Sequence, residues 1–106
     1  MYRVRLTRPK LDERAVRAIL VVLFLEGLSD GNLVRKWIVR YRQSVRRGYI
    51  RPKLMDWEII ELREMAERRW NELERFEQRA LRKIMRLADR IRKGETRGAY
   101  RWRKWH

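Results

Sequence analysis

The chain has 106 residues, of which 29 are lysine or arginine and 14 are aspartate or glutamate, so its formal net charge is +15. Hydrophobic residues make up 44% of the sequence, which is enough to fold and excludes a purely disordered basic tail. A chain this short excludes a large enzyme with a deep central pocket. The sequence contains no cysteine, which excludes disulfides, thiolate metal sites and cysteine nucleophiles.

The sequence shows neither a membrane span nor a signal peptide. Its longest apolar run, residues 18–25, has eight residues, whereas a bilayer span takes about 20. The basic N-terminus is not followed by the apolar stretch and cleavage site of a secretory signal. We therefore expect a soluble protein that is not secreted, without a transmembrane segment, located in the cytoplasm, on the nucleoid or inside a virion.

Arginine outnumbers lysine 23 to 6, and charge is distributed unevenly along the chain. Residues 1–55 carry a net charge of +10, residues 56–77 of −4 and residues 78–106 of +9. The planar guanidinium group of arginine binds phosphate in a bidentate manner, so the excess of arginine and of positive charge favours a polyanionic partner. A GC-rich genome or a thermophilic host would also raise the arginine content.

The N-terminal residues 2–8 alternate apolar and basic side chains, which is typical of an extended strand, and Pro9 ends the pattern. One such run cannot form a sheet alone. We therefore expect residues 1–10 to form a basic arm that lies on a partner or pairs with the C-terminal tail. Arg3 and Arg5 are its candidate phosphate contacts.

Residues 12–48 are predicted to form a helical hairpin. The first helix, residues 12–26, begins with two acidic residues that suit the positive end of the helix dipole, and it stops at Gly27. Its apolar part, residues 19–25, also has high strand propensity, so a buried strand is the alternative. Because this segment is apolar on every side, it must be enclosed by the other helices or by another subunit.

The second helix is predicted over residues 31–47, capped by Ser29 or Asp30 and ended by Gly48. Apolar residues recur on one side of it at helical spacing: Val34, Ile38, Tyr41 and Val45, flanked by Leu33 and Trp37. Basic residues fill the other sides. Pro52 then forces a short extended break.

The third helix is predicted to run without interruption over residues 56–93, which contain neither glycine nor proline. Its apolar residues follow at steps of three or four: Ile59, Leu62, Ala66, Trp70, Leu73, Phe76, Ala80, Ile84, Leu87 and Ile91. A helix of this length would extend about 55 Å. Trp57 and Trp70 are expected in the core. Two glycines then predict a loose, extended basic tail over residues 94–106.

Together these elements predict an all-α fold of a single domain, with a helical hairpin, one long C-terminal helix and short basic extended arms at both ends. Three helices do not easily hide both the apolar run at 18–25 and the stripe of the third helix. Large exposed apolar surfaces mark interfaces, so we also expect a homo-oligomer.

Residues suited to catalysis are scarce. The single histidine is the terminal His106, where other groups are not expected to orient it. Neither serine has a histidine near it in sequence, and there is no glycine-rich phosphate loop. Glu58, Glu61 and Glu64 share a helix face but lack a further metal ligand, so we interpret them as a solvated acidic face. The sequence predicts no enzymatic activity, no cofactor and no metal.

The candidate binding residues are mainly basic, because each phosphate that a cation neutralises releases counterions. On the second helix they are Arg35, Lys36, Arg40, Arg42, Arg46 and Arg47. On the third helix they are Arg79, Arg82, Lys83, Arg86 and Arg90. In the tail they are Arg101, Trp102, Arg103, Lys104 and Trp105, whose rings could stack on bases. The alternatives are solvated basic faces on the helices, and a tail that folds back on the core beside Tyr2 and Val4.

The connection between the first two helices resembles a helix-turn-helix motif. Gly27, Leu28 and Leu33 fit the turn glycine and two of the apolar positions, whereas Leu23 and Lys36 depart from the usual residues. A plain helical hairpin explains the same pattern.

We expect a non-enzymatic structural protein that binds DNA or RNA mainly through phosphates, as a packaging, coat, chromatin-like or ribonucleoprotein component. A helix-turn-helix DNA-binding regulator is one alternative. A helical adaptor or inhibitor that binds an acidic protein is the other.

Overall fold

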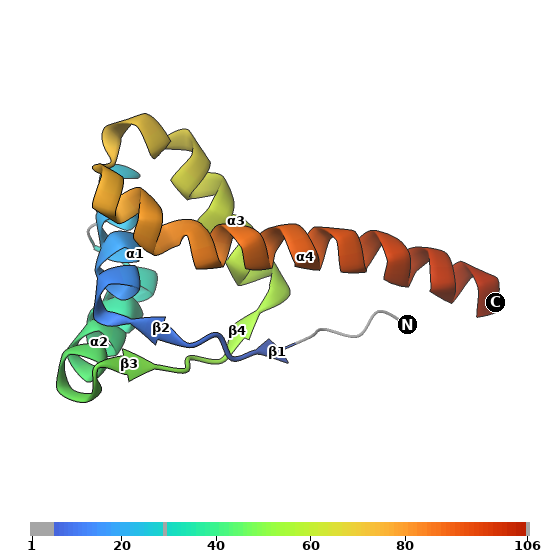
Figure 1. Cartoon of the computed structure of the whole chain (residues 1–106), viewed down its shortest axis with the longest axis horizontal. Helices are drawn as coiled ribbons and strands as arrows, with labels where there is room; N and C mark the ends of the chain where they lie inside the picture. Colours follow the sequence, from blue (N-terminus) through green and yellow to red (C-terminus); the bar gives the residue numbers. More distant parts are fainter. Residues whose placement is uncertain (1–5, 29, 106) are drawn as a thin grey trace.

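The computed structural model of the chain (Figure 1) describes residues 6–28 and 30–105, with side chains as far as residue 94. Four helices account for most of this part: α1 (Glu13–Leu25), α2 (Asn32–Arg47), α3 (Asp56–Arg68) and α4 (Arg75–Trp105). A 3-10 turn, η1 (Trp70–Glu72), lies between α3 and α4. The predicted all-α class is confirmed. No helix within these ranges is both long and apolar enough to span a membrane.

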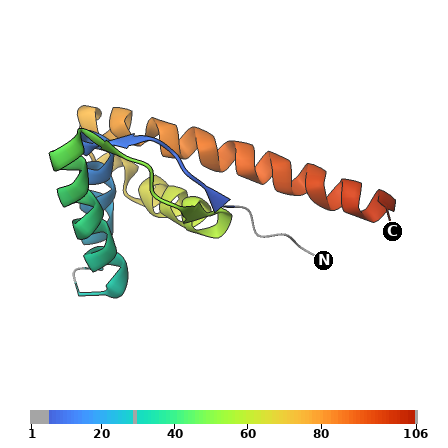
Figure 2. The same cartoon turned by 90° about the horizontal axis from the view of Figure 1, so that it is seen from below.

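Short strands join the N-terminal segment to the connection between α2 and α3. They have two residues each: β1 (Leu6–Thr7), β2 (Leu11–Asp12), β3 (Tyr49–Ile50) and β4 (Leu54–Met55). β1 pairs antiparallel with β4, and β2 pairs antiparallel with β3, so the two segments run side by side in Figures 1 and 2. The described end of the predicted N-terminal arm, residues 6 and 7, thus pairs with β4. Arg3 and Arg5 lie outside the described residues.

α1 begins and ends close to the predicted positions. The Asp12 side chain caps its first turn by accepting a hydrogen bond from the Ala15 amide at 2.8 Å. The chain leaves the helix at Gly27, whose φ of 77° lies in the left-handed region that glycine adopts without a steric penalty. The helical interpretation of this apolar segment is therefore confirmed, and the buried strand is excluded.

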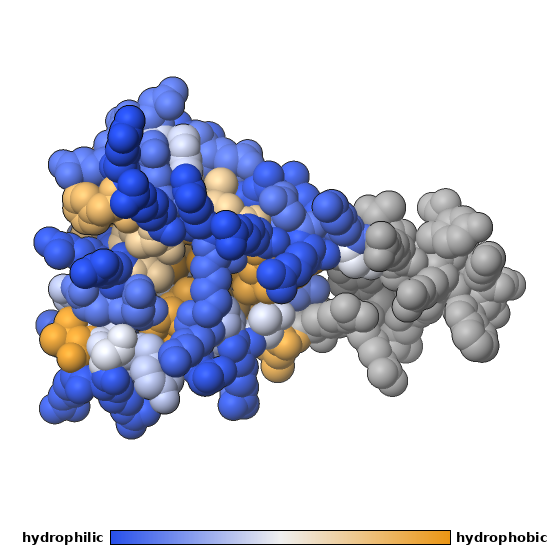
Figure 3. Space-filling model, in the orientation of Figure 1, coloured by the Kyte–Doolittle hydropathy of each residue, from blue (hydrophilic) through white to orange (hydrophobic). Residues whose placement is uncertain are grey.

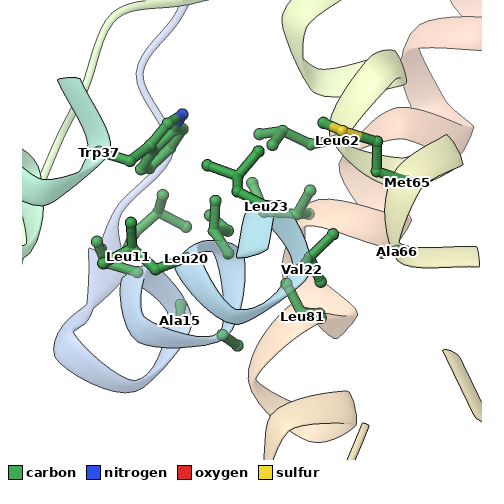
Figure 4. Close-up of a cluster of buried hydrophobic side chains, with 14 of the residues drawn as sticks. Leu11, Ala15, Leu20, Val22, Leu23, Trp37, Leu62, Met65, Ala66 and Leu81 are labelled. Atoms are coloured by element: carbon green, nitrogen blue, oxygen red, sulfur yellow. The ribbon is translucent and has the colours of Figure 1, made fainter. Parts of the chain in front are cut away.

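The apolar side chains of α1 form the centre of the core. α1 contacts each of the other three helices. In Figure 4, Leu23 lies between Trp37 of α2 and Leu62 of α3, while Met65 of α3 and Leu81 of α4 close the cluster around the same helix. The helices of the chain itself thus enclose α1, which removes one of the two reasons for expecting a second subunit.

α2 runs antiparallel to α1 and forms the predicted hairpin with it (Figures 1 and 2). The predicted cap by Ser29 or Asp30 is wrong, because Gly31 is the N-cap residue of α2 and supplies no side-chain hydrogen bond to the first turn. Gly48 ends the helix as predicted, at a φ of 84°. Val45, predicted on the buried stripe, is exposed, and Ser44 is buried instead and donates a hydrogen bond to the Tyr41 carbonyl at 2.6 Å.

The predicted uninterrupted third helix is wrong, because the chain breaks between α3 and α4 and folds back. Leu73 has extended backbone, and the Gln78 side chain donates a hydrogen bond to the Trp70 carbonyl at 2.7 Å. α4 then packs against both α3 and α1. A straight helix could not place both halves of its apolar stripe against the short hairpin, so burial of that stripe favours the break.

Two aromatic side chains that the sequence placed in the core are exposed. Trp57 is 57% exposed and Phe76 is 53% exposed. Both lie in the first turn of a helix, Trp57 in α3 and Phe76 in α4. Because the chain folds back between α3 and α4, the side of each helix that is buried differs from the side expected for one continuous helix. Trp70, the third aromatic residue of this region, packs against the core as expected.

The predicted extended tail is also wrong, because α4 continues as far as Trp105. An isolated glycine in a helix costs only about 1 kcal/mol relative to alanine, so Gly94 and Gly98 do not end it. The side chains of residues 95–106 lie outside the described part, as does the proposed contact between the tail and the N-terminal arm.

Glu26 joins the end of α1 to the end of α3. Its carboxylate accepts hydrogen bonds from Arg68 Nε at 2.9 Å and Arg69 Nε at 2.8 Å, and also from Arg68 Nη2. These bonds, first from Arg68 and then from Arg69, hold the pKa of Glu26 below its ordinary value. The ionised carboxylate therefore stabilises the folded state above the unfolded pKa, and this contribution is lost as pH falls through the folded pKa.

Glu26→Gln is expected to lower the free energy of unfolding at neutral pH by about 1–2 kcal/mol, because the side chain is only 11% exposed while Arg68 is largely solvated. The difference from the unmutated protein should begin to shrink as the pH falls below the ordinary glutamate pKa of about 4.3, and it should disappear once the pH has fallen below the lowered pKa of the folded state. Urea unfolding at several pH values measures both effects. Glu61→Gln, at an exposed carboxylate, is the control and should change little. Equal losses for the two variants would contradict the role of the ion pairs.

Candidate functional site

One face of α4 carries a continuous row of basic side chains, which we call the α4 ridge. The helix buries the side of Leu81, Ile84 and Ala88 against α1 and α3. The opposite side carries a basic residue at every third or fourth position, and all are exposed: Arg75, Arg79, Arg82, Arg86, Arg90 and Lys93. At about 1.5 Å per residue the row is about 27 Å long. Figure 3 shows hydrophilic side chains over most of this view of the molecule, with smaller apolar patches between them.

Three acidic side chains of the middle segment, Glu64, Glu67 and Glu72, pair with arginines that lie outside the α4 ridge. Arg63 binds both Glu67 and Asp89, and Arg92 binds Glu64 with its Nη2 3.0 Å from the carboxylate. No member of the ridge forms a salt bridge with any described residue. The α4 ridge is therefore a row of charges of one sign without a neutralising acidic partner among the described residues, whereas the solvent side of an ordinary amphipathic helix carries charges of both signs.

α2 provides a second basic surface, separate from the first. Its exposed members are Arg35, Lys36, Arg42, Arg46 and Arg47, and none forms a salt bridge within the described part of the chain. α1 packs against both α2 and α4, so the two basic surfaces lie on two helices that are joined through α1.

Arg40, the sixth basic residue predicted on α2, is placed differently. Its guanidinium lies over the Trp37 ring with 4.6 Å between Cζ and the ring centroid. Burial lowers the pKa of Arg40, and the nearby Glu58 carboxylate opposes that shift. Arg40 is thus set back from the exposed side chains and contributes to the packing of α2.

A cleft between α1 and α4 brings together residues that sequence reasoning did not combine, and we call it the α1–α4 cleft. It has a volume of about 810 Å³. Its basic lining residues are Lys10, Arg14, Arg17, Arg79 and Lys83. Short side chains on both helices leave the hollow open: Ala15, Ala18 and Ala80. The exposed ring of Phe76 borders it. Only Arg79 and Lys83 had been predicted. The sequence feature that could have indicated this cleft is the pair Arg14 and Arg17, which lie three residues apart beside the apolar run of α1.

The basic residues predicted in the tail have no described side chains, but their sequence positions extend the ridge pattern. Counting on from Lys93 along α4 at steps of three or four gives Arg97, Arg101 and Lys104. Arg101, Trp102, Arg103, Lys104 and Trp105 therefore belong to the same helix as the ridge and not to an extended arm.

Three acidic residues of α3 that share a face in the sequence have different surroundings in the structure. Glu58 accepts a hydrogen bond from the Met55 amide at 3.4 Å, Glu64 pairs with Arg92, and Glu61 is exposed. Within the described ranges no three histidine, aspartate or glutamate side chains gather where they could hold a metal ion.

The α1–α2 hairpin differs from the helix-turn-helix geometry. Its helices run antiparallel side by side, and six residues separate Leu25 from Asn32. In the DNA-binding motif the helices cross at about 90–120° and are joined by a turn of about three or four residues.

Comparison with known proteins adds no family to these observations. No protein-family model, no curated protein and no solved structure matches this chain.

Proposed function

We propose that the protein is a non-enzymatic nucleic-acid-binding structural protein, a packaging, coat, chromatin-like or ribonucleoprotein component that holds phosphates on the α4 ridge and on the exposed basic side chains of α2. The observation that carries this proposal is the row of six exposed basic side chains on α4 that have no acidic partner among the described residues. Arginine predominates in it, and its planar fork matches phosphate oxygens.

Several features favour phosphate binding without strict sequence reading. Phosphate contacts position a protein on a strand but carry no direct base information. The antiparallel α1–α2 hairpin does not present α2 as a helix-turn-helix would, which weighs against a sequence-specific regulator. The homo-oligomer stays a prediction, supported by the exposed Phe24, Val39 and Trp57 side chains.

Binding should be strongly salt dependent. In parallel titrations against duplex DNA, single-stranded DNA and structured RNA, the logarithm of the affinity is expected to fall linearly with the logarithm of the salt concentration. The magnitude of the slope should be at least about 4, because each neutralised phosphate contributes about 0.9 for duplex DNA and 0.7 for single strands. A duplex of random sequence should compete as well as any defined sequence. Affinities that do not change with salt for all three nucleic acids would contradict the proposal.

A further inference from the structure

The α1–α4 cleft is large enough for a nucleotide. Its volume of about 810 Å³ falls within the range of about 300–1,000 Å³ typical of small-ligand sites. It is bordered by the first turns of α1 and α4, where the helix dipoles place partial positive charge. The volume of the cleft therefore admits a ligand of this size, and the two helix N-termini favour a negatively charged one.

The side-chain charges of the cleft add to this preference. Its three acidic groups are engaged within the protein: Asp12 caps α1, Glu13 accepts a hydrogen bond from the Tyr41 hydroxyl at 3.1 Å, and Glu77 accepts one from the Glu74 amide at 2.9 Å. Arg14, Arg17 and Arg79 form no salt bridge with any described residue. The cleft thus offers three unpaired guanidinium groups to a ligand.

Phe76 gives the cleft a second kind of contact. Its ring borders the cleft and is 53% exposed, although the other apolar side chains of α4 that the structure describes, between Ala80 and Ile91, pack against the core. An exposed aromatic ring beside unpaired arginines is the combination with which proteins bind single strands, because the ring stacks on a base while the cations hold the backbone. In a duplex the base faces are already stacked and are not accessible to such a ring.

We propose that the α1–α4 cleft binds single-stranded nucleic acid, with one unpaired base stacked on Phe76 and the adjoining phosphates held by Arg14, Arg17 and Arg79. The inference rests on the proposed function and adds a second, base-dependent mode to the phosphate contacts of the α4 ridge. It predicts that the protein distinguishes a strand that carries bases from one that carries only the sugar–phosphate backbone.

The test compares a single-stranded oligonucleotide of about ten nucleotides with an abasic strand of the same length. The full chain should bind the base-bearing strand more tightly. Phe76→Leu should weaken that binding by about 5- to 150-fold, the range of one base–aromatic stack. The same variant should leave the affinity for the abasic strand unchanged, and Phe76→Tyr should retain the preference. Arg14→Gln combined with Arg17→Gln should weaken the binding of both strands.

Phe24→Leu is the matched control, because Phe24 is also on a helix, is 49% exposed and does not line the cleft. It should change neither affinity. The inference is overturned if Phe76→Leu has no effect on the base-bearing strand, if it weakens both strands equally, or if free AMP competes as well as the oligonucleotide. If duplex and single strands bind but ignore Phe76→Leu, only this inference fails. If no strand binds at all, the proposed function fails with it.

Discussion

Replacing Arg82, Arg86 and Arg90 of the α4 ridge with glutamine is expected to lower the affinity for duplex DNA by about 10²- to 10³-fold at about 0.1 M salt. Each lost phosphate contact removes about 0.9 from the salt slope, and at this salt concentration that corresponds to nearly one decade of affinity. The three residues lie outside the α1–α4 cleft, and each is exposed, so the fold and the single-strand site are preserved. The slope itself should fall by about 2.7.

The control variant must show whether the affinity depends on the position of the basic residues or only on the net charge of the protein. Arg8, Arg51 and Lys53 are exposed on the strand connections, and their replacement by glutamine gives a protein of the same net charge. This variant should bind duplex DNA within a few-fold of the unmutated protein. If the two triple variants lost affinity equally, binding would follow total charge, and the ridge would have no special part in it.

The first two helices could be predicted because local signals mark both ends of α1 and the end of α2. Asp12 caps α1, and Gly27 and Gly48 end α1 and α2 in the left-handed conformation that favours glycine. The prediction of one uninterrupted third helix was wrong, because the spacing of apolar residues indicates which of them share a helix face. It does not indicate whether the helix continues without a break. Residues 69–74 contain neither glycine nor proline, and the break there is set by packing against α1, which no local pattern contains.

The same limit applies to the candidate site. The basic residues of α4 follow a single helical spacing, so most of the ridge could be predicted from the sequence. The α1–α4 cleft could not, because Arg14 and Arg17 meet Phe76 and Arg79 only when the chain folds back after α3. A sequence that predicts one straight helix cannot place residues separated by about sixty positions at the walls of one cleft.

The tryptophans of α2 and α3 are the same residue type in two different environments, so their contributions to the free energy of unfolding are expected to differ. Trp37 is 1% exposed at the contact of α2 with α1, whereas Trp57 is 57% exposed at the start of α3. Trp37→Ala is expected to lower the free energy of unfolding by about 3–5 kcal/mol, the usual cost of removing a buried aromatic side chain. The variant also removes the ring beneath the guanidinium of Arg40. That loss approaches the total stability of a small domain, which is about 5–15 kcal/mol.

Trp57→Ala removes the same side chain from a solvated position and should cost less than about 1 kcal/mol, since its indole donates only to the Met55 sulfur, 3.2 Å away. Urea unfolding followed by far-ultraviolet circular dichroism compares the two variants without depending on tryptophan fluorescence. Because neither residue belongs to the α4 ridge or the α1–α4 cleft, nucleic-acid affinity at low urea should be kept by Trp57→Ala. Trp37→Ala should lose it only in proportion to the unfolded fraction. A loss for Trp57→Ala as large as that for Trp37→Ala would mean that Trp57 is covered in solution, which is what burial in a homo-oligomer would produce.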